Sequence, residues 1–226
     1  MGSFVTTSIT PHAAAKLLIS NEIDIAADIP HDLALRILDE LLGMTIEECL
    51  SIVDFNNYGD VADVKYIPQF GKTETLLRVP YYFIEKGQTC VDYPQLGFYL
   101  KSDINATLVA NTKYGENHGK MMALLGLTNC VNKRIVPSAF TSAFCSYDAD
   151  KQYEIILKLF FRIPVVQIIL KAASINQFNG YLPMRALMDS TRRRRAYCLR
   201  AIFKLLSSYD NDELNYRINN IIWEDN

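Results

Sequence analysis

The chain has 226 residues, of which half are apolar, and a formal net charge of −2. This composition supports one good hydrophobic core or two small ones. The sequence has no run of eighteen apolar residues, and its N-terminus, MGSFVTTSIT, lacks the apolar stretch of a signal peptide, so we expect neither a membrane partner nor a secretory leader. The five cysteines are scattered without a CxxC pair and the three histidines lie far apart, which predicts a reduced, cytoplasmic protein without a metal or cofactor.

Residues 1–70 contain three candidate helices, at 13–20, 30–42 and from Thr45 onward. Thr45 and Glu48 have the spacing of a capping box, in which each residue satisfies a backbone N–H of the other. The second candidate helix has a broad leucine-rich face that ends at Gly43. This segment therefore has two possible roles, a helical lid on the next domain or the surface of a homodimer.

Residues 71–149 predict a different unit. Helical patterns cover 74–86, 93–100 and 111–127, and Pro80 suggests a kink in the first of them or a start after Val79. Residues 130–137 follow as two short strands around a turn at Asn132–Lys133. Three helices followed by a hairpin is the element order of a winged helix-turn-helix.

Residues 150–226 repeat this order. An apolar helical run over 150–173 is interrupted before Pro164, and a short helix over 182–189 and a longer one over 190–208 follow it. The tail predicts a second hairpin, which turns at Asn219–Asn220. The expected fold is mainly α with small β wings: two tandem winged helix-turn-helix domains, at 71–149 and 150–226, behind an N-terminal helical segment at 1–70.

The helix predicted over 190–208 carries four consecutive arginines, Arg192 to Arg195, in its first turns, with Ser190 or Thr191 as the expected N-cap. Positive charge at the positive end of the helix dipole is unfavourable unless an anion lies nearby, and a DNA phosphate would supply that anion. Consecutive helical residues point about 100° apart. We therefore expect two of the four arginines to contact DNA and the others to brace the helix or remain solvated.

The charge distribution supports the same partner. Between Lys158 and Lys204 the sequence has ten basic residues and a single acidic residue, Asp189, whereas residues 1–150 have 11 basic and 18 acidic residues. One basic segment in an acidic chain indicates an anionic partner at a defined surface.

The stretch GYLPMRALMDSTRRRRAYCLRAIFKLLSSY resembles a pattern in the tandem winged-helix modules of restriction endonucleases and related phage-defence proteins. The earlier stretch KYGENHGKMMALLGLTNCVNKRIVPSAFTSAF resembles the companion module, and the two cover about 71–226. The sequence departs from the pattern in its wing and aromatic positions and has no accompanying nuclease or ATPase domain. The resemblance implies recognition of double-stranded DNA and a restriction or defence protein as a further partner.

In a winged helix the third helix enters the major groove and the wing contacts the DNA backbone or minor groove. An arginine side chain can donate two hydrogen bonds to a guanine base, and an asparagine side chain can form two hydrogen bonds with an adenine base. The candidate contacts in the second module are Thr191, Arg192, Arg193, Arg194 and Arg195, with Arg185 and Lys171 on flanking phosphates. Those in the first module are Asn111, Lys113, Tyr114, Asn117 and Lys120, and those in the wings are Lys133, Arg134, Arg217 and Asn219.

Two other functions are compatible with the sequence. The helices of a winged-helix module can dock on a protein, in which case the arginines would pair with an acidic protein surface. Alternatively, Asp54, Asp63 and Lys65 have the loose form of a metal-dependent nuclease site, with two carboxylates for Mg²⁺ beside a lysine. The same three residues are also compatible with ordinary surface charge.

Overall fold

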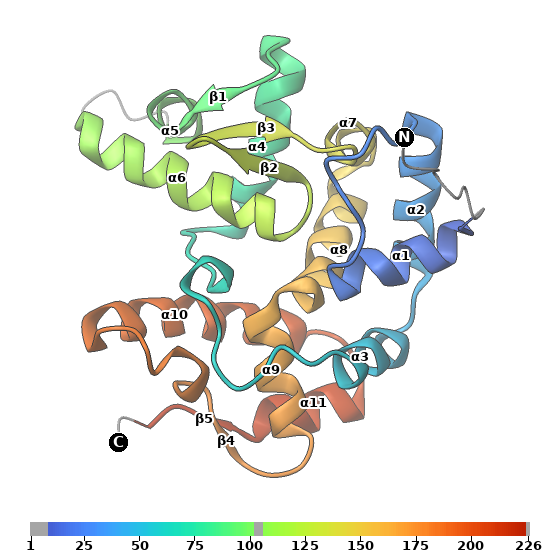
Figure 1. Ribbon diagram of the computed structural model, residues 1–226, viewed down its shortest axis with the longest axis vertical. Helices are drawn as coiled ribbons and strands as arrows, with labels where there is room; N and C mark the ends of the chain where they lie inside the picture. The colour runs from blue at the N-terminus through green and yellow to red at the C-terminus, as the bar shows by residue number, and fades with distance from the viewer. Residues whose placement is uncertain (1–8, 102–105, 225–226) are drawn as a thin grey trace, which may run out of the picture.

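The computed structural model describes residues 9–101 and 106–224 (Figure 1). These residues form a mainly helical fold with a three-stranded sheet and one pair of two-residue strands. Within the described part of the chain, no helix has the length and apolar character needed to cross a bilayer.

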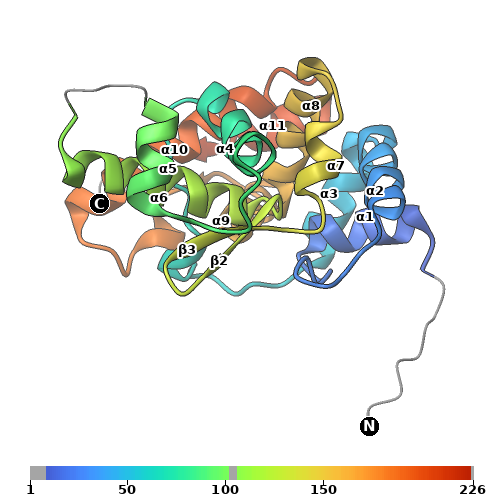
Figure 2. The same cartoon turned by 90° about the horizontal axis from the view of Figure 1, so that it is seen from above.

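The N-terminal segment forms three helices, as the sequence predicts: α1 (Pro11–Ser20), α2 (His31–Gly43) and α3 (Ile46–Phe55). The capping box of Thr45 and Glu48 at the start of α3 is confirmed. Figures 1 and 2 show these helices at the end of the molecule away from α5. Leu38 and Leu41 of the leucine-rich face of α2 are fully buried within the chain, and Leu33, Leu35 and Leu42 pack against the same core while remaining partly exposed.

The next segment forms the three-stranded sheet and the helices around it. In chain order these elements are η1, a 3₁₀ turn (Val64–Tyr66), α4 (Thr73–Lys86), β1 (Val91–Asp92), α5 (Tyr93–Lys101), α6 (Leu108–Leu124), β2 (Thr128–Val131) and β3 (Arg134–Pro137). The strands are antiparallel in the order β1-β3-β2. The hairpin is confirmed, because Asn132 and Lys133 form its turn with φ values of 49° and 61°. The suggested start after Val79 is wrong, because α4 begins at Thr73 and contains Pro80.

Two glycines allow α5 and α6 to approach closely. A Cβ atom at Gly115 would lie 2.0 Å from the carbonyl oxygen of Tyr93, and one at Gly97 would lie 1.9 Å from that of Asn111. Asn111 itself is fully buried, and its side-chain amide donates to the carbonyl of Ala106. The prediction that Asn111 contacts a DNA base is therefore wrong, since its position in α6 faces α5.

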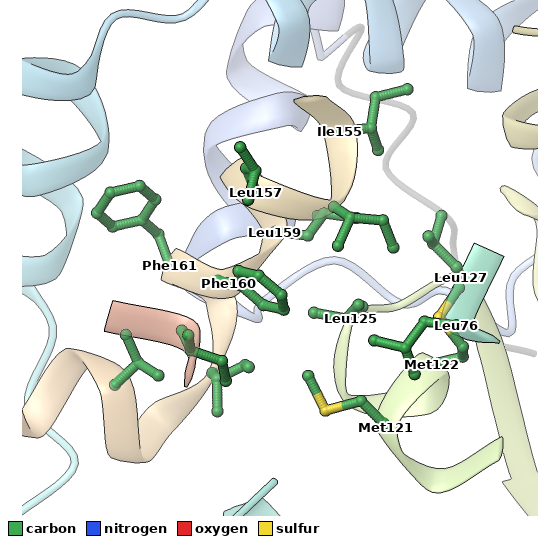
Figure 3. Packing of buried hydrophobic residues seen from close by; sticks show 14 of the residues in the cluster. Leu76, Met121, Met122, Leu125, Leu127, Ile155, Leu157, Leu159, Phe160 and Phe161 are labelled. Atoms are coloured by element: carbon green, nitrogen blue, oxygen red, sulfur yellow. The ribbon is translucent and has the colours of Figure 1, made fainter. Parts of the chain in front are cut away.

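The C-terminal half begins with helices that pass through the centre of the molecule. They are α7 (Thr141–Cys145), α8 (Ala149–Leu159), the 3₁₀ turn η2 (Phe160–Arg162) and α9 (Pro164–Ala173). The expected interruption before Pro164 is confirmed. Figure 3 shows Leu159 and Phe160 beside Met122 and Leu125 of the α6 region. The buried apolar residues of all three sequence segments belong to one continuous core.

The last elements differ from the predicted second module. They are β4 (Phe178–Asn179), the 3₁₀ turn η3 (Leu182–Met184), α10 (Asp189–Leu206), α11 (Asp212–Asn219) and β5 (Ile221–Ile222). The second hairpin is wrong: residues 212–219 are helical, with Asn211 as N-cap, and β5 pairs in parallel with β4. The short helix expected over 182–189 is a 3₁₀ turn of three residues.

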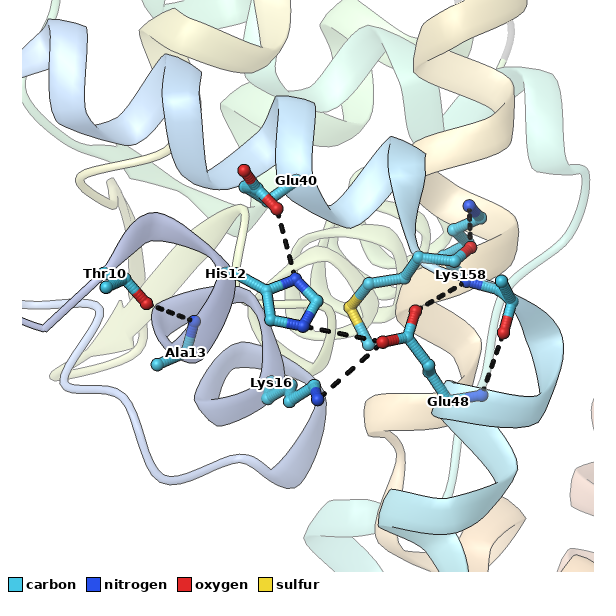
Figure 4. A network of polar contacts seen from close by, with 9 residues as sticks. Thr10, His12, Ala13, Lys16, Glu40, Glu48 and Lys158 are labelled. Carbon is cyan, nitrogen blue, oxygen red and sulfur yellow. Dashed lines mark hydrogen bonds and ion pairs between the residues drawn. The ribbon is translucent and has the colours of Figure 1, made fainter.

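Several basic side chains tie these segments together inside the protein. Lys158, almost fully buried, donates to the carbonyls of Leu42 and Met44 at the end of α2 (Figure 4). Arg162 donates to the carbonyls of Leu18 and Leu124, near the ends of α1 and α6. Helix C-termini carry carbonyls without intrahelical partners and a partial negative charge. Part of the basic charge counted in the sequence is therefore used inside the fold.

Candidate functional site

A cavity of about 540 Å³ lies between α6, α10 and the segment 64–69. Figure 1 shows α6 and α10 one above the other. The charged side chains that line the cavity are Lys65, Lys113, Glu116, Lys120, Arg194 and Arg195. Five are cationic and one is anionic, in a chain whose formal net charge is −2. We call this cavity and its rim the basic groove.

The α6 wall of the basic groove combines opposite charges. Lys113, Glu116 and Lys120 lie on one helix face because they are spaced by three and four residues. The Glu116 carboxylate accepts from Lys113 Nζ at 2.8 Å and from Lys120 Nζ at 2.7 Å. These two hydrogen bonds lower the pKa of Glu116, so its carboxyl group is ionised at neutral pH. Glu116 thus offsets part of the charge of both lysines on this wall.

The opposite wall is formed by α10. Arg194 is exposed, whereas Arg195 is half-buried and donates from Nη1 to the carbonyl of Ile67 at 2.5 Å. Burial, together with the neighbouring charge of Arg194, lowers the pKa of Arg195. The bond to Ile67 fixes the segment 64–69 against α10 and so sets the width of the groove at this end.

The start of α10 differs from the prediction. Met188 occupies the N-cap position, so the expected cap at Ser190 or Thr191 is wrong, and Thr191 lies half-buried within the helix. Arg192 donates to the Asp189 carboxylate at 2.7 Å, and its guanidinium lies over the ring of Tyr181. Asp189 in the first turn therefore supplies negative charge at the helix N-terminus, where the sequence predicts a DNA phosphate.

The floor of the basic groove is mainly aliphatic. It is lined by Ile67, Met121, Leu124 and Pro164, together with Tyr66, whose ring lies 4.7 Å from Lys65 Nζ. Two side-chain amides also line the cavity, those of Gln69 and Asn117. Neither amide has a hydrogen-bond partner within residues 9–101 and 106–224. The groove thus combines cations, an apolar floor and two amides available to a ligand.

The structure brings together Lys113, Asn117, Lys120, Arg194 and Arg195 of the predicted contacts. Arg193 is also exposed on α10, and it makes an interaction within the chain. The sequence holds no signal for Gln69, and it predicts Lys65 in the candidate nuclease site with Asp54 and Asp63. The charge of Lys65 beside Tyr66 was visible in the sequence, but its position opposite α6 depends on the tertiary fold.

Other predicted contacts lie away from the basic groove. Tyr114 pairs through its hydroxyl with Thr75 at 3.3 Å, and its ring packs on that of His118, with 4.1 Å between the ring centroids. Lys133 and Arg134 are exposed at the hairpin turn.

Arg185 and Lys171 line a second cavity, of about 400 Å³. Lys171 Nζ donates to the carbonyl of Asn56 at 2.7 Å, so this lysine already satisfies a backbone group of the chain. Arg185 is exposed at the edge of this cavity. The structure places neither residue on the basic groove.

Arg217 does not lie on a wing. It is buried on α11, where it donates to both carboxylate oxygens of Asp54, at 2.6 and 2.8 Å, and to Glu213 at 2.7 Å. Asn219, the other candidate on that wing, is the last residue of α11. The predicted wing contacts at both positions are wrong because the residues around them are helical.

The residues of the nuclease interpretation have partners within the chain. Asp54 is paired with Arg217, and Asp63 accepts from the backbone N–H of Lys65 at 3.1 Å and pairs with Lys65 Nζ at 3.4 Å. Among the residues that the structure describes, no group of three or more His, Cys, Asp and Glu side chains could hold a metal ion.

Comparison of the chain with models of protein families, with curated proteins and with solved structures gave no match. The chemistry of the basic groove therefore carries the functional argument.

Proposed function

We propose that this protein binds double-stranded DNA, with the basic groove and the β2–β3 turn as its contact surface. One observation carries the proposal: Lys113 and Lys120 of α6 lie across a single groove from Arg194 of α10. The sequence predicts these residues in two separate DNA-binding modules. Their convergence supports one composite surface instead of two independent ones.

We also propose that residues 73–137 form a winged helix. The order α4-β1-α5-α6-β2-β3, with a sheet in the order β1-β3-β2, supports this assignment. In such a unit α6 occupies the position of the recognition helix, and the β2–β3 turn, with Lys133 and Arg134, is the wing. Because α10 lies across the groove from α6, we propose that Lys113 and Lys120 contact DNA at the rim of the groove and that α6 does not enter the major groove. In this proposal α10 is an additional wall beside the winged helix, since the second predicted wing is absent from the described residues.

The charge of the groove supports an anionic partner more strongly than the charge of the basic segment does. Lys158, Arg162 and Lys171 lie in that segment but donate to backbone carbonyls inside the fold. The groove differs, because its cations line a solvent-accessible cavity. Lys113 and Lys120 share one carboxylate, that of Glu116, and Arg194 is exposed, whereas Lys65 pairs with Asp63 and Arg195 donates to a backbone carbonyl. Lysine and arginine side chains on DNA phosphates release condensed counterions, so binding through this groove should weaken steeply with salt.

Fluorescence anisotropy of a labelled mixed-sequence duplex across a salt series tests the proposal. Replacing Arg194 with alanine should reduce the magnitude of the slope of log K against log[salt] by about 0.9, the value for one lost phosphate contact. Arg36→Ala is the matched control, because Arg36 is exposed on α2 and the change in net charge is the same. The control should keep the wild-type slope. No binding by the wild type at low salt would refute DNA binding, and an equal loss in both variants would refute the basic groove as the contact site.

The association with restriction or phage defence rests on the sequence resemblance, and we propose it on that ground alone. Host cells that express the wild type or Arg194→Ala would be challenged with phage. Protection that depends on Arg194 supports a defence role, and equal plaque counts with and without the wild-type protein would argue against it.

A further inference from the structure

We propose that the basic groove takes up a single nucleotide unit, with its base on the aliphatic floor and its phosphate at Arg194. The inference rests on the proposed function, because it concerns the same groove. The inference adds to the proposed function the class of the ligand and its orientation in the groove.

The size and enclosure of the groove support one nucleotide instead of a duplex. Its volume of about 540 Å³ falls within the range of about 300–1,000 Å³ that is typical of small-molecule sites. A helix that reads the major groove must be open on both flanks, since the duplex backbones pass on either side of it. Asn117 and Lys120 of α6 instead face a cavity whose other walls are α10 and the segment 64–69. A duplex can contact the rim of this groove, and its interior suits a nucleotide that has left the base stack.

The lining of the interior matches the parts of a nucleotide. Ile67, Met121, Leu124 and Pro164 provide an aliphatic surface for the faces of a base. The amides of Gln69 and Asn117 each offer a donor and an acceptor, which the hydrogen-bonding edge of a base requires. Neither amide is engaged elsewhere in the described part of the chain.

The charges orient the ligand. On the α6 wall, Glu116 accepts hydrogen bonds from both lysines and so offsets part of their positive charge. On the α10 wall, Arg194 is exposed and lines the cavity, whereas Arg195 already donates to the carbonyl of Ile67. A phosphate is therefore favoured at Arg194, which leaves the base toward Asn117.

The nucleotide can come from DNA, as an extruded residue, or from solution, as a free nucleotide, and the two sources need separate experiments. For the first, a duplex carries 2-aminopurine at one position, in a matched form and in a mismatched form that is easier to open. Extrusion removes the fluorescent base from the stack and should raise its emission several-fold on binding. For the second, the four deoxynucleoside monophosphates are tested for protection of Cys130, an exposed residue that lines the groove, against alkylation by iodoacetamide.

Asn117→Trp tests the groove directly, because it fills the cavity and keeps all five cations. Asn176→Trp is the matched control, since Asn176 is exposed and outside the lining of the groove. Both variants are compared with the wild type at protein concentrations at which anisotropy shows the duplex to be fully bound, and we expect Asn117→Trp to lose the fluorescence rise or the protection of Cys130. The control should keep both.

The outcomes separate this inference from the proposed function. A fluorescence rise identifies the nucleotide as part of DNA, and protection of Cys130 identifies a free nucleotide; either result, if abolished by Asn117→Trp, supports the inference. Salt-dependent duplex binding with neither signal would overturn the inference and leave DNA binding intact. Protection of Cys130 without any duplex binding would refute DNA binding and support the nucleotide site.

Discussion

Replacing Arg217 with methionine separates a structural role for this residue from a role in binding DNA. Its side chain is 6% exposed and makes three charged hydrogen bonds, two to Asp54 and one to Glu213. Methionine keeps much of the apolar packing of the arginine stem but removes all three bonds. Asp54 and Glu213 are 44% and 52% exposed, so both carboxylates can be hydrated by water in the variant.

The exposure of the partners sets the expected magnitude. Removing one partner of a fully buried ion pair costs about 3–5 kcal/mol, because the remaining charge is left without a partner. Here the remaining charges reach water, and we expect a loss of roughly 2 kcal/mol from the charge-assisted hydrogen bonds. For a chain of this size that corresponds to a fall in Tm of about 4–8 °C.

Urea denaturation and a thermal melt measure this loss, and the anisotropy salt series measures DNA binding in the same variant. Asp54→Asn should destabilise the protein too, and the double variant should lose less than the sum of the two single changes, because the residues share one interaction. The salt slope should not change. An unchanged Tm together with a slope reduced by about 0.9 would refute the structural role and restore Arg217 as a phosphate contact.

Three further predictions concern other parts of the fold. Gly115→Ala should lower the free energy of unfolding by about 2–3 kcal/mol in urea denaturation, since the added Cβ would lie 2.0 Å from the carbonyl oxygen of Tyr93. Burial lowers the pKa of His118, so the unfolded state binds more protons and stability should fall as pH drops below about 6.5. His118→Gln should weaken this pH dependence of the urea midpoint. Burial raises the pKa of Cys49 to about 12, whereas Cys130 is exposed, so mass spectrometry should find Cys130 alkylated in the native protein and Cys49 only after unfolding.

The sequence predicted the elements whose signals are local. The capping box at Thr45 requires two residues three apart, and the β2–β3 turn requires positive φ at Asn132 and Lys133. The break before Pro164 follows from a ring that restricts the preceding residue. None of these features depends on what packs against the segment.

The tail shows where a local pattern was ambiguous. Leu214, Tyr216 and Ile218 alternate, which favours a strand, but Leu214 and Arg217 are also spaced as one face of a helix. Asn211 as an N-cap, followed by acidic residues in the first turn, was a helix-start signal in the same stretch. The burial of Arg217 against Asp54 then favours the helix. This contact joins residues 163 positions apart, so no local sequence pattern contains it.

One wall of the basic groove can be predicted in part from the sequence, because the spacing of apolar residues in α10 shows which of its faces is buried. Ala196, Leu199 and Ile202 are buried, and extending this face back by three and four residues per turn reaches Arg195 and Arg192. Those two arginines must therefore lie on or beside the packed side, where one donates to the carbonyl of Ile67 and the other to Asp189.

The same helical spacing puts Arg194 on the outer side of α10, so periodicity alone distinguishes it from Arg192 and Arg195, which lie on or beside the packed side. What periodicity does not contain is the identity of the opposite wall. The three-dimensional packing of α6 and α10 around the core decides that Arg194 faces Lys113 and Lys120 across a cavity. A count of basic residues treats all cations alike, whereas the fold uses Lys158 and Arg162 on helix ends and leaves Arg194 at the groove. Arg194 is therefore the arginine whose removal distinguishes a DNA-binding groove from general surface charge.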